Sequence, residues 1–182
     1  RNGKASQLTK ISDTEGNFTA PLSNQDYFGG SVARLGDLDK DGIPDVAVGA
    51  SRDDDGGTNR GAVYVLFLNA NGSVKSHQKI SNRITGKINV LQNEDRFGFS
   101  VAHAGDLNLD GSPDLLVGAF YAETNHSGAA FLISLNPDGT AKDCIKIGHN
   151  LAWNESLSAN DYFGASVASA GDFNKDGLLD WL

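Results

Sequence analysis

The chain has 182 residues, 39% of them hydrophobic, with 22 glycines and 4 prolines, which indicates a globular domain rather than a fibrous or disordered protein. The formal net charge of −8 argues against nucleic acid as a partner, and no apolar run of about 18 residues, the length of a membrane-spanning helix, is present. The single cysteine, Cys144, excludes an intrachain disulfide, and no Cys–His cluster has the spacing of a zinc site.

Short apolar runs separated by turn residues predict β-strands along the whole chain, and no segment has a sustained helical period. A strand is expected near Lys4–Ser12, where the chain begins. The first complete unit is expected to have four strands, over 29–35, 45–50, 61–68 and 74–81. A further strand is expected at Trp181-Leu182.

These strands belong to a repeat. Asp26-Tyr-Phe-Gly-Gly-Ser-Val-Ala recurs nearly unchanged at Asp95 and Asp161, with spacings of 69 and 66 residues between the phenylalanines. Four-stranded units in tandem predict an all-β fold of β-propeller blades, because a β-solenoid would need far shorter repeats. The expected repeats are approximately 1–12 (the fourth strand only), 26–81, 95–148 and 161–182 (truncated).

The chain thus supplies about two full blades plus terminal strands, whereas propellers have typically four to eight blades. It opens on Arg1 and contains no Met, so we expect it to be processed or to be a piece of a longer chain. The alternative is that several copies assemble to close a ring.

Carboxylates crowd the segment Asp37–Asp45, where they occupy positions 1, 3, 5 and 9 of a nine-residue loop with Gly42 at position 6. Oxygen donors at odd positions around a glycine turn suit a hard divalent ion such as Ca²⁺, and position 7 would offer its backbone carbonyl. Two more loops share this spacing, so about three Ca²⁺ ions are expected. The candidate ligands are Asp37, Asp39, Asp41, Ile43 and Asp45, then Asp106, Asn108, Asp110, Ser112 and Asp114, then Asp172, Asn174, Asp176, Leu178 and Asp180.

An EF-hand loop begins in the same way but ends on a glutamate at position 12, which is Val48 or Val117 here. The Asp at position 9 is expected to replace that glutamate. Asp, Asn and Gly are also good turn formers, which would explain one such loop but not identical spacing in three. Loops of this type suit the millimolar calcium outside cells, so we expect an extracellular or cell-surface protein.

The residues around each loop resemble the FG-GAP repeat of integrin α-subunit propellers and their bacterial relatives. They are Phe28-Gly29 with Gly49-Ala50, Phe97-Gly98 with Gly118-Ala119, and Phe163-Gly164; Ser51 and Phe120 stand where the family has proline. The resemblance implies a propeller of usually seven blades, so the remaining blades would come from the same precursor or from other copies. It also implies that an N-terminal strand completes the last blade, a role expected for Lys4–Ser12.

A partner is expected at the end of the blades opposite the calcium loops, because variable loops on a rigid scaffold carry recognition. The resemblance implies the same face for a protein or glycan ligand, with the calcium ions structural. The loops concerned are 13–26, 51–60, 82–95, 120–127 and 149–161, and the candidate residues are Arg52–Asp55, Tyr121 and Trp153, each of which could instead be a solvated or self-packed loop residue.

Nothing in the sequence forms a catalytic constellation. His77, His103, His126 and His149 occupy unrelated repeat positions, and Cys144 aligns with His77 in a tolerant strand position. We therefore expect a non-catalytic adhesion or recognition module. The alternatives are the propeller part of a larger secreted hydrolase or polysaccharide lyase, and a self-assembling structural repeat. Sequons at Asn17, Asn71, Asn125 and Asn154 matter only in a eukaryotic protein.

Overall fold

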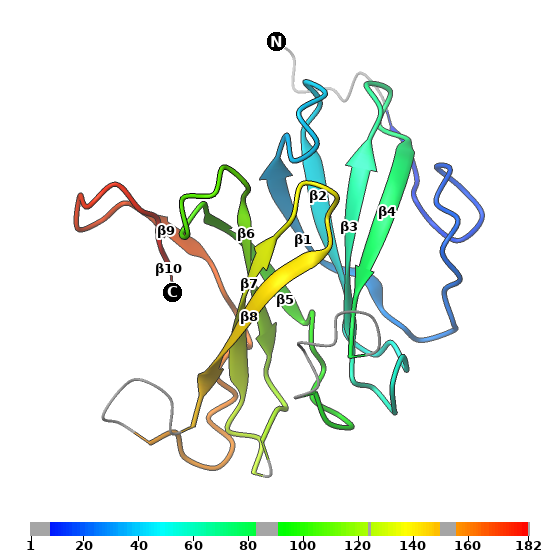
Figure 1. Ribbon diagram of the computed structural model, residues 1–182. Coiled ribbons are helices and arrows are strands. Elements are labelled where there is room, and N and C mark those ends of the chain that lie inside the picture. The colour runs from blue at the N-terminus through cyan, green and yellow to red at the C-terminus, as the bar shows by residue number, and fades with distance from the viewer. Residues whose placement is uncertain (1–7, 83–90, 124, 150–155, 182) are drawn as a thin grey trace, which may run out of the picture.

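The computed structural model describes residues 8–82, 91–123, 125–149 and 156–181, and this part of the chain contains strands and no helix (Figure 1). Two four-stranded antiparallel sheets have the strand orders β1-β2-β3-β4 and β5-β6-β7-β8, and a third sheet pairs β9 with β10. The strands are β1 Phe28–Gly36, β2 Asp45–Ala50, β3 Ala62–Leu68, β4 Val74–Ile80, β5 Ser100–Gly105, β6 Asp114–Ala119, β7 Ala129–Leu135, β8 Ala141–Gly148, β9 Ser169–Gly171 and β10 Asp180–Trp181.

The all-β prediction and the division into four-stranded blades are confirmed. We call β1–β4 blade one and β5–β8 blade two. Each strand of blade one lies within about a residue of its predicted range, because the apolar runs alternate and end in turn residues. The prediction of a strand near Lys4–Ser12 is wrong for the described residues of that range. Residues 8–11 pair with no strand, and Ser12 bridges only to Glu15 in a local turn. Residues 4–7 and Leu182 lie outside the described residues.

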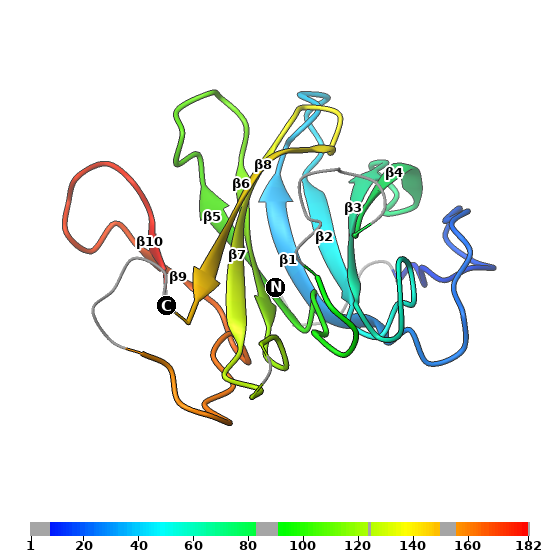
Figure 2. The same cartoon turned by 60° about the horizontal axis from the view of Figure 1, so that its bottom comes forward.

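Alternate side chains of β3 divide the hydrophobic core in two. Val63, Val65 and Phe67 face blade two and share a buried cluster with residues of β5, β6 and β7. Tyr64 and Leu66 point to the other side of the sheet, into a separate cluster. The two blades therefore pack face to face, with each sheet covering one side of its neighbour (Figure 2).

The N-terminal segment covers the outer face of blade one in place of the predicted strand. Phe18 is 2% exposed, and its ring stacks on Phe28 with centroids 4.9 Å apart and meets Tyr64 edge-on at 5.5 Å. The segment is tied to the start of β4, since Val74 N donates to Gly16 O and Asn17 Nδ2 donates to Val74 O, both at 2.8 Å. Burial of an aromatic ring, rather than strand pairing, thus holds this segment.

The joint between repeats explains the Phe-Gly motif. Phe97 forms a parallel bridge with Gly61 of blade one, and Ser31 Oγ donates to Gly98 O at 2.8 Å. Gly98 has φ +86°, and a Cβ there would lie 2.4 Å from Ala62 O, so only glycine fits. The next joint repeats these contacts, with Phe163 bridging to Gly128 and Ser100 Oγ donating to Gly164 O.

Antiparallel pairing gives each blade two distinct ends. The loops after β1 and β3 lie at one end, beside the corresponding loops of blade two (Figure 1). The connection from β2 to β3 lies at the opposite end, as do the end of β4 and the start of β5. The aspartate loops and the variable loops are therefore separated by the length of the strands.

Close packing at the joint predicts that Gly49→Ala is strongly destabilising. The added Cβ would lie 2.0 Å from Gly98 O and 2.3 Å from Ser31 Oγ, so the blades must shift apart, at a cost of about 2–4 kcal/mol in unfolding free energy. Gly36→Ala is the matched control: its φ is +87° but no atom lies within 4 Å, so it should cost about 1 kcal/mol. Denaturant unfolding measures both, and equal costs would contradict the proposed steric joint.

Candidate metal centre and the opposite loop face

The three aspartate loops fold through one hydrogen-bond pattern. In the first loop the carboxylate of Asp37 accepts from Asp41 N and Gly42 N, both at 2.9 Å, and Asp41 Oδ1 accepts from Ile43 N at 2.8 Å. The same bonds recur in the other loops, from Asp110 and Gly111 to Asp106 and from Asp176 and Gly177 to Asp172. The side chains at positions 1 and 5 therefore shape the loop backbone themselves.

The glycine at position 6 is required by backbone conformation. Gly42 has φ +89°, and a Cβ there would meet no protein atom within 4 Å. The residue at position 4 also adopts the left-handed conformation, in Lys40, Leu109 and Lys175 with φ of 61°, 56° and 64°. Two left-handed residues, at positions 4 and 6, turn the loop tightly, and in the first loop the side chains at positions 1, 3 and 9 come together.

The aspartate at position 9 joins the loop to the sheet. Asp45 is 1% exposed; its Oδ2 accepts from Leu38 N at 2.9 Å and its Oδ1 from Leu68 N at the end of β3 at 3.1 Å. Asp114 in blade two is equally buried and accepts from Leu107 N. Burial raises the pKa of both carboxyl groups above the ordinary value, although these backbone hydrogen bonds oppose the shift.

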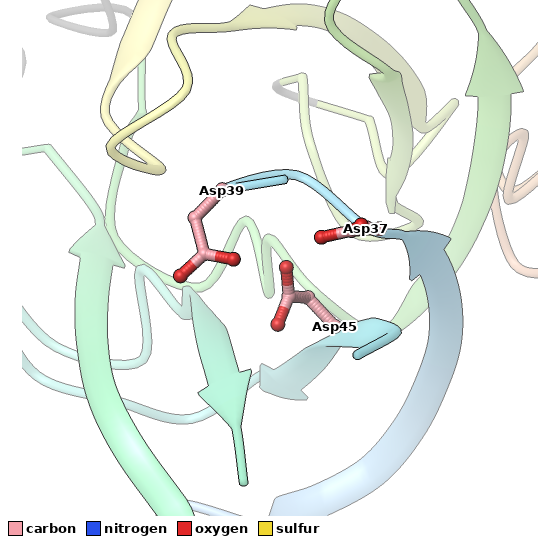
Figure 3. A group of neighbouring side chains, drawn as sticks. All are labelled: Asp37, Asp39 and Asp45. Atoms are coloured by element: carbon pink, nitrogen blue, oxygen red, sulfur yellow. The ribbon is translucent and has the colours of Figure 1, made fainter. Parts of the chain in front are cut away.

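Three carboxylates of the first loop converge on one point (Figure 3). One oxygen each of Asp37, Asp39 and Asp45 lies within 4.8 Å of the others. Asp39 Oδ1 is buried and has no hydrogen-bond partner, a costly arrangement unless a cation compensates it. Asp41 is outside this group, and no three acidic side chains of the second or third loop come this close within the described residues.

Lysines from the fourth strands contact these loops, which sequence reasoning missed. Lys75 Nζ lies 2.7 Å from Asp39 Oδ2 and 2.6 Å from Asp41 Oδ2, and Lys142 Nζ lies 2.7 Å from Asp110 Oδ2 in blade two. The hydrogen bonds to Asp39 and Asp41 raise the pKa of Lys75, and the bond from Lys75 lowers that of Asp41. The sequence does contain one indication of these contacts, since both lysines occupy the same position of the repeat.

The opposite end of the blades carries aromatic and arginine side chains in contact. Tyr121 stacks on Tyr162 with centroids 5.6 Å apart, and the Arg96 guanidinium lies 5.1 Å from the Tyr121 ring centre. Phe99 and Phe120, 4.1 Å apart, extend this group. We call these five residues the aromatic patch. Phe99 and Tyr162 remain 41% and 36% exposed, so the patch meets solvent.

Blade one has a related pair with its members exchanged. Arg52 lies 4.4 Å from the ring centre of Tyr27, and these positions correspond to Tyr121 and Arg96 in blade two. Tyr27, Arg96 and Tyr162 all have left-handed φ values, of 59°, 60° and 54°. A strained backbone thus presents the same position of each repeat at this face.

The other partner candidates are placed differently. Asp53 is 3% exposed and bound by Tyr64 Oη at 3.1 Å and Lys79 Nζ at 2.7 Å, so it belongs to the interior of the blade. Asp54 is exposed, and its Oδ1 accepts from Asn59 N at 2.7 Å. Asp55 Oδ2 accepts from Ser81 Oγ at 2.7 Å. Trp153 lies outside the described residues.

Cys144, His77 and His126 take part in packing or local hydrogen bonds. Burial raises the pKa of the Cys144 thiol to about 11, which suppresses the thiolate at neutral pH. His77 packs against Phe18, and His126 lies within hydrogen-bond distance of Tyr121 O. These environments suit structural side chains.

Two four-stranded blades, the repeated spacing of the aspartate loops and the Phe-Gly joint are the features of a repeat-built β-propeller. Residues 28–66 match the family model described as FG-GAP repeat, and most of the chain is similar in sequence to integrin alpha proteins. It is 34% identical to human Integrin alpha-11 over 161 residues and 34% identical to Caenorhabditis elegans Integrin alpha pat-2 over 184 residues. These alignments cover 85% and 90% of the chain but only 12% and 14% of the relatives.

A shorter alignment gives higher identity: Integrin alpha-5 of Xenopus laevis is 40% identical over 118 residues, which are 60% of this chain and 11% of the relative. In the part of the chain that the structure describes, no helix is long and apolar enough to cross a membrane.

The anchoring role of Asp45 predicts that Asp45→Ala destabilises the protein even without calcium. The substitution leaves Leu38 N and Leu68 N without their acceptor in a buried site, at a cost of about 2–3 kcal/mol in unfolding free energy. Asp41→Ala is the control, since Asp41 is exposed and should cost less than half as much. Both are compared by denaturant unfolding in EDTA, and equal losses would refute the anchoring role.

Proposed function

We propose that the chain is a calcium-stabilised, non-catalytic propeller module of an extracellular or cell-surface adhesion protein. The observation that carries the proposal is the convergence of Asp37, Asp39 and Asp45, together with the buried Asp39 Oδ1 that has no hydrogen-bond partner. The integrin alpha relatives support the adhesion role. The module would bind a protein or glycan partner at the end opposite the aspartate loops.

The donor set fits a hard divalent cation. Carboxylate oxygens at positions 1, 3, 5 and 9 and a backbone carbonyl at position 7 are all oxygen ligands, which Ca²⁺ prefers, and no soft sulfur or imidazole donor is included. In the first loop these would be Asp37, Asp39, Asp41, Asp45 and the carbonyl of Ile43. The second and third loops, with Asn108 and Asn174 at position 3, would hold two more ions.

A structural role for calcium follows from where the loops attach. Each loop joins the first two strands of a blade, and Asp45 also holds Leu68 N at the end of β3. A bound ion neutralises the repulsion between the carboxylates and so stabilises three strands together. The ion would stiffen the blade at the end away from the aromatic patch.

Removal of calcium is expected to lower thermal stability. EDTA should reduce the melting temperature of the chain, and excess Ca²⁺ should restore it, because an ion that binds only the folded state stabilises it by mass action. The variant Asp37→Ala/Asp106→Ala/Asp172→Ala, which removes position 1 from all three loops, should lose the calcium response. An identical melting temperature of the wild-type chain in EDTA and in calcium would contradict the proposal.

The aromatic patch is a better candidate for the partner surface than the aspartate-loop end of the blades. Tyrosine and arginine are the residues that dominate binding energy in protein interfaces, and here they are preassembled by stacking. Arg52 and Tyr27 extend the same chemistry to blade one. A partner presenting aromatic or charged side chains would fit this surface.

Blade two also leaves a face for a further blade. In blade one the corresponding face is covered by the β7–β8 turn, where a Cβ at Gly139 would lie 3.0 Å from the ring of Phe67. In blade two an open cavity of about 390 Å³ is lined by residues that include Leu107, Leu132 and Ile145. This supports the proposal that remaining blades come from the same precursor or from other copies.

The partner surface predicts that Arg96→Ala/Tyr121→Ala abolishes binding while leaving the calcium response unchanged. The immobilised wild-type chain should retain a partner from the medium of the cells that produce the protein, and the double variant should lose it, with affinity reduced at least tenfold. The matched control Lys75→Ala/Lys142→Ala, at the opposite end, should retain it. Equal retention by the aromatic-patch variant and the wild type would exclude this surface.

A further inference from the structure

We infer that Lys75 sets the calcium affinity of the first loop by acting as a tethered cation that Ca²⁺ must displace from Asp41. The inference rests on the proposed calcium binding and goes beyond it, because Lys75 is outside the loop and belongs to a different hairpin. It sits at the second position of β4 and reaches the loop between β1 and β2.

The contacts of Asp41 show why the lysine competes. Asp41 Oδ1 accepts from Ile43 N at 2.8 Å, and Oδ2 pairs with Lys75 at 2.6 Å. Both oxygens of position 5 therefore have partners, and Asp41 is absent from the group that converges around the site. An ion that takes Asp41 as a ligand must share or displace the ammonium.

The contacts of Asp39 show that Lys75 occupies only one of its two carboxylate oxygens, which leaves the other available to an ion. Lys75 holds only Oδ2 of this carboxylate, at 2.7 Å, while Oδ1 is buried without a partner, and one oxygen of the carboxylate lies within 4.8 Å of oxygens of Asp37 and Asp45 (Figure 3). The lysine thus balances two negative charges from outside the loop and keeps Asp39 oriented.

In each loop the carboxylate at position 5 accepts from a nitrogen of another side chain, which is a fourth-strand lysine in the first two loops. Lys142 pairs with Asp110 Oδ2 at 2.7 Å in the second loop, and in the third the side-chain amide of Asn174 donates to Asp176 Oδ2 at 3.0 Å. Lys75 contacts the carboxylates at positions 3 and 5 of its loop, and Lys142 contacts the carboxylate at position 5 of the second loop, where Asn108 stands at position 3. The lysine contact at the same position of two repeats indicates a built-in counter-charge rather than a chance surface contact.

Charge count is one of the properties that tune calcium affinity, and the lysine subtracts one charge from the loop with most carboxylates. Its removal should therefore have two opposite effects. Calcium should bind more tightly, because no ammonium occupies Asp41. The metal-free protein should be less stable, because the four carboxylates of the loop then lose the positive charge that offsets part of their repulsion.

The test uses Lys75→Met, which keeps the aliphatic stem, and the matched control Lys40→Met. Lys40 is an exposed lysine of the same loop with no ion pair to a described residue, so its removal changes the charge but breaks no carboxylate contact. Both are introduced into a parent chain carrying Asp106→Ala and Asp172→Ala, so that titration calorimetry reports the first loop. Melting in EDTA is measured in parallel, for these chains and for the same lysine variants with all three loops intact.

We expect Lys75→Met to tighten calcium binding about three- to tenfold, the range of an exposed ion pair with two partners, and Lys40→Met to change it less than twofold. The melting temperature in EDTA should fall by about 2–4 °C for Lys75→Met only. Equal affinities of the two variants, or weaker binding by Lys75→Met, would overturn the inference while leaving calcium binding intact. If the parent fails to fold, the comparison is made with intact loops, where an unchanged calcium-induced rise in melting temperature for Lys75→Met overturns it. A folded parent that binds no calcium refutes the proposed function at this loop as well.

Discussion

Mutual repulsion of carboxylates is the constraint on which each blade depends. Four of them lie within the nine residues of the first loop, and three bring an oxygen within 4.8 Å of one another. The protein reduces this repulsion with backbone N–H groups directed at Asp37 and Asp45 and with the ammonium of Lys75. Asp39 Oδ1 still has no hydrogen-bond partner, and we propose that a bound calcium ion compensates its negative charge.

The loop and the sheet are one mechanical unit because Asp45 belongs to both. It begins β2, accepts from Leu68 N at the end of β3, and closes the loop through Leu38 N. Order at the aspartate end therefore extends into the two central, buried strands. Those strands lead to the connections at the other end, where Arg52 and Tyr121 contact aromatic rings. A stiff blade holds that surface in a fixed shape, which favours binding at low entropic cost.

The sequence predicted the structure correctly where a feature depends on neighbouring residues or recurs in each repeat. Strand periods, turns and the loop spacing depend on neighbouring residues, and comparison of repeats located the Phe-Gly joint before its geometry was known. Repeat comparison aligns Lys75 with Lys142 but could not give the partners of Lys75, because Asp39 and Asp41 lie on another hairpin and meet it only after β3 and β4 pair. The same reason hid the contact between Arg96 and Tyr121.

The strand expected near Lys4–Ser12 shows the limit of repeat comparison. Lys10-Ile11-Ser12 matches the end of β4 in sequence, yet residues 8–11 have no strand to pair with, and the chain instead buries Phe18 against Tyr64. A strand pattern specifies a strand only when a partner edge is present. The structure brings together three of the predicted metal ligands, all in the first loop. The ligand sets of the second and third loops remain predictions.

The central claim is that the aspartate loops are structural calcium sites, and direct location of the ion tests it best. Crystals grown in saturating calcium and measured for anomalous scattering should show a peak among Asp37, Asp39 and Asp45, about 2.3–2.6 Å from their oxygens. Peaks at the equivalent places in the second and third loops would complete the account. A well-ordered first loop without a peak at saturating calcium would contradict it.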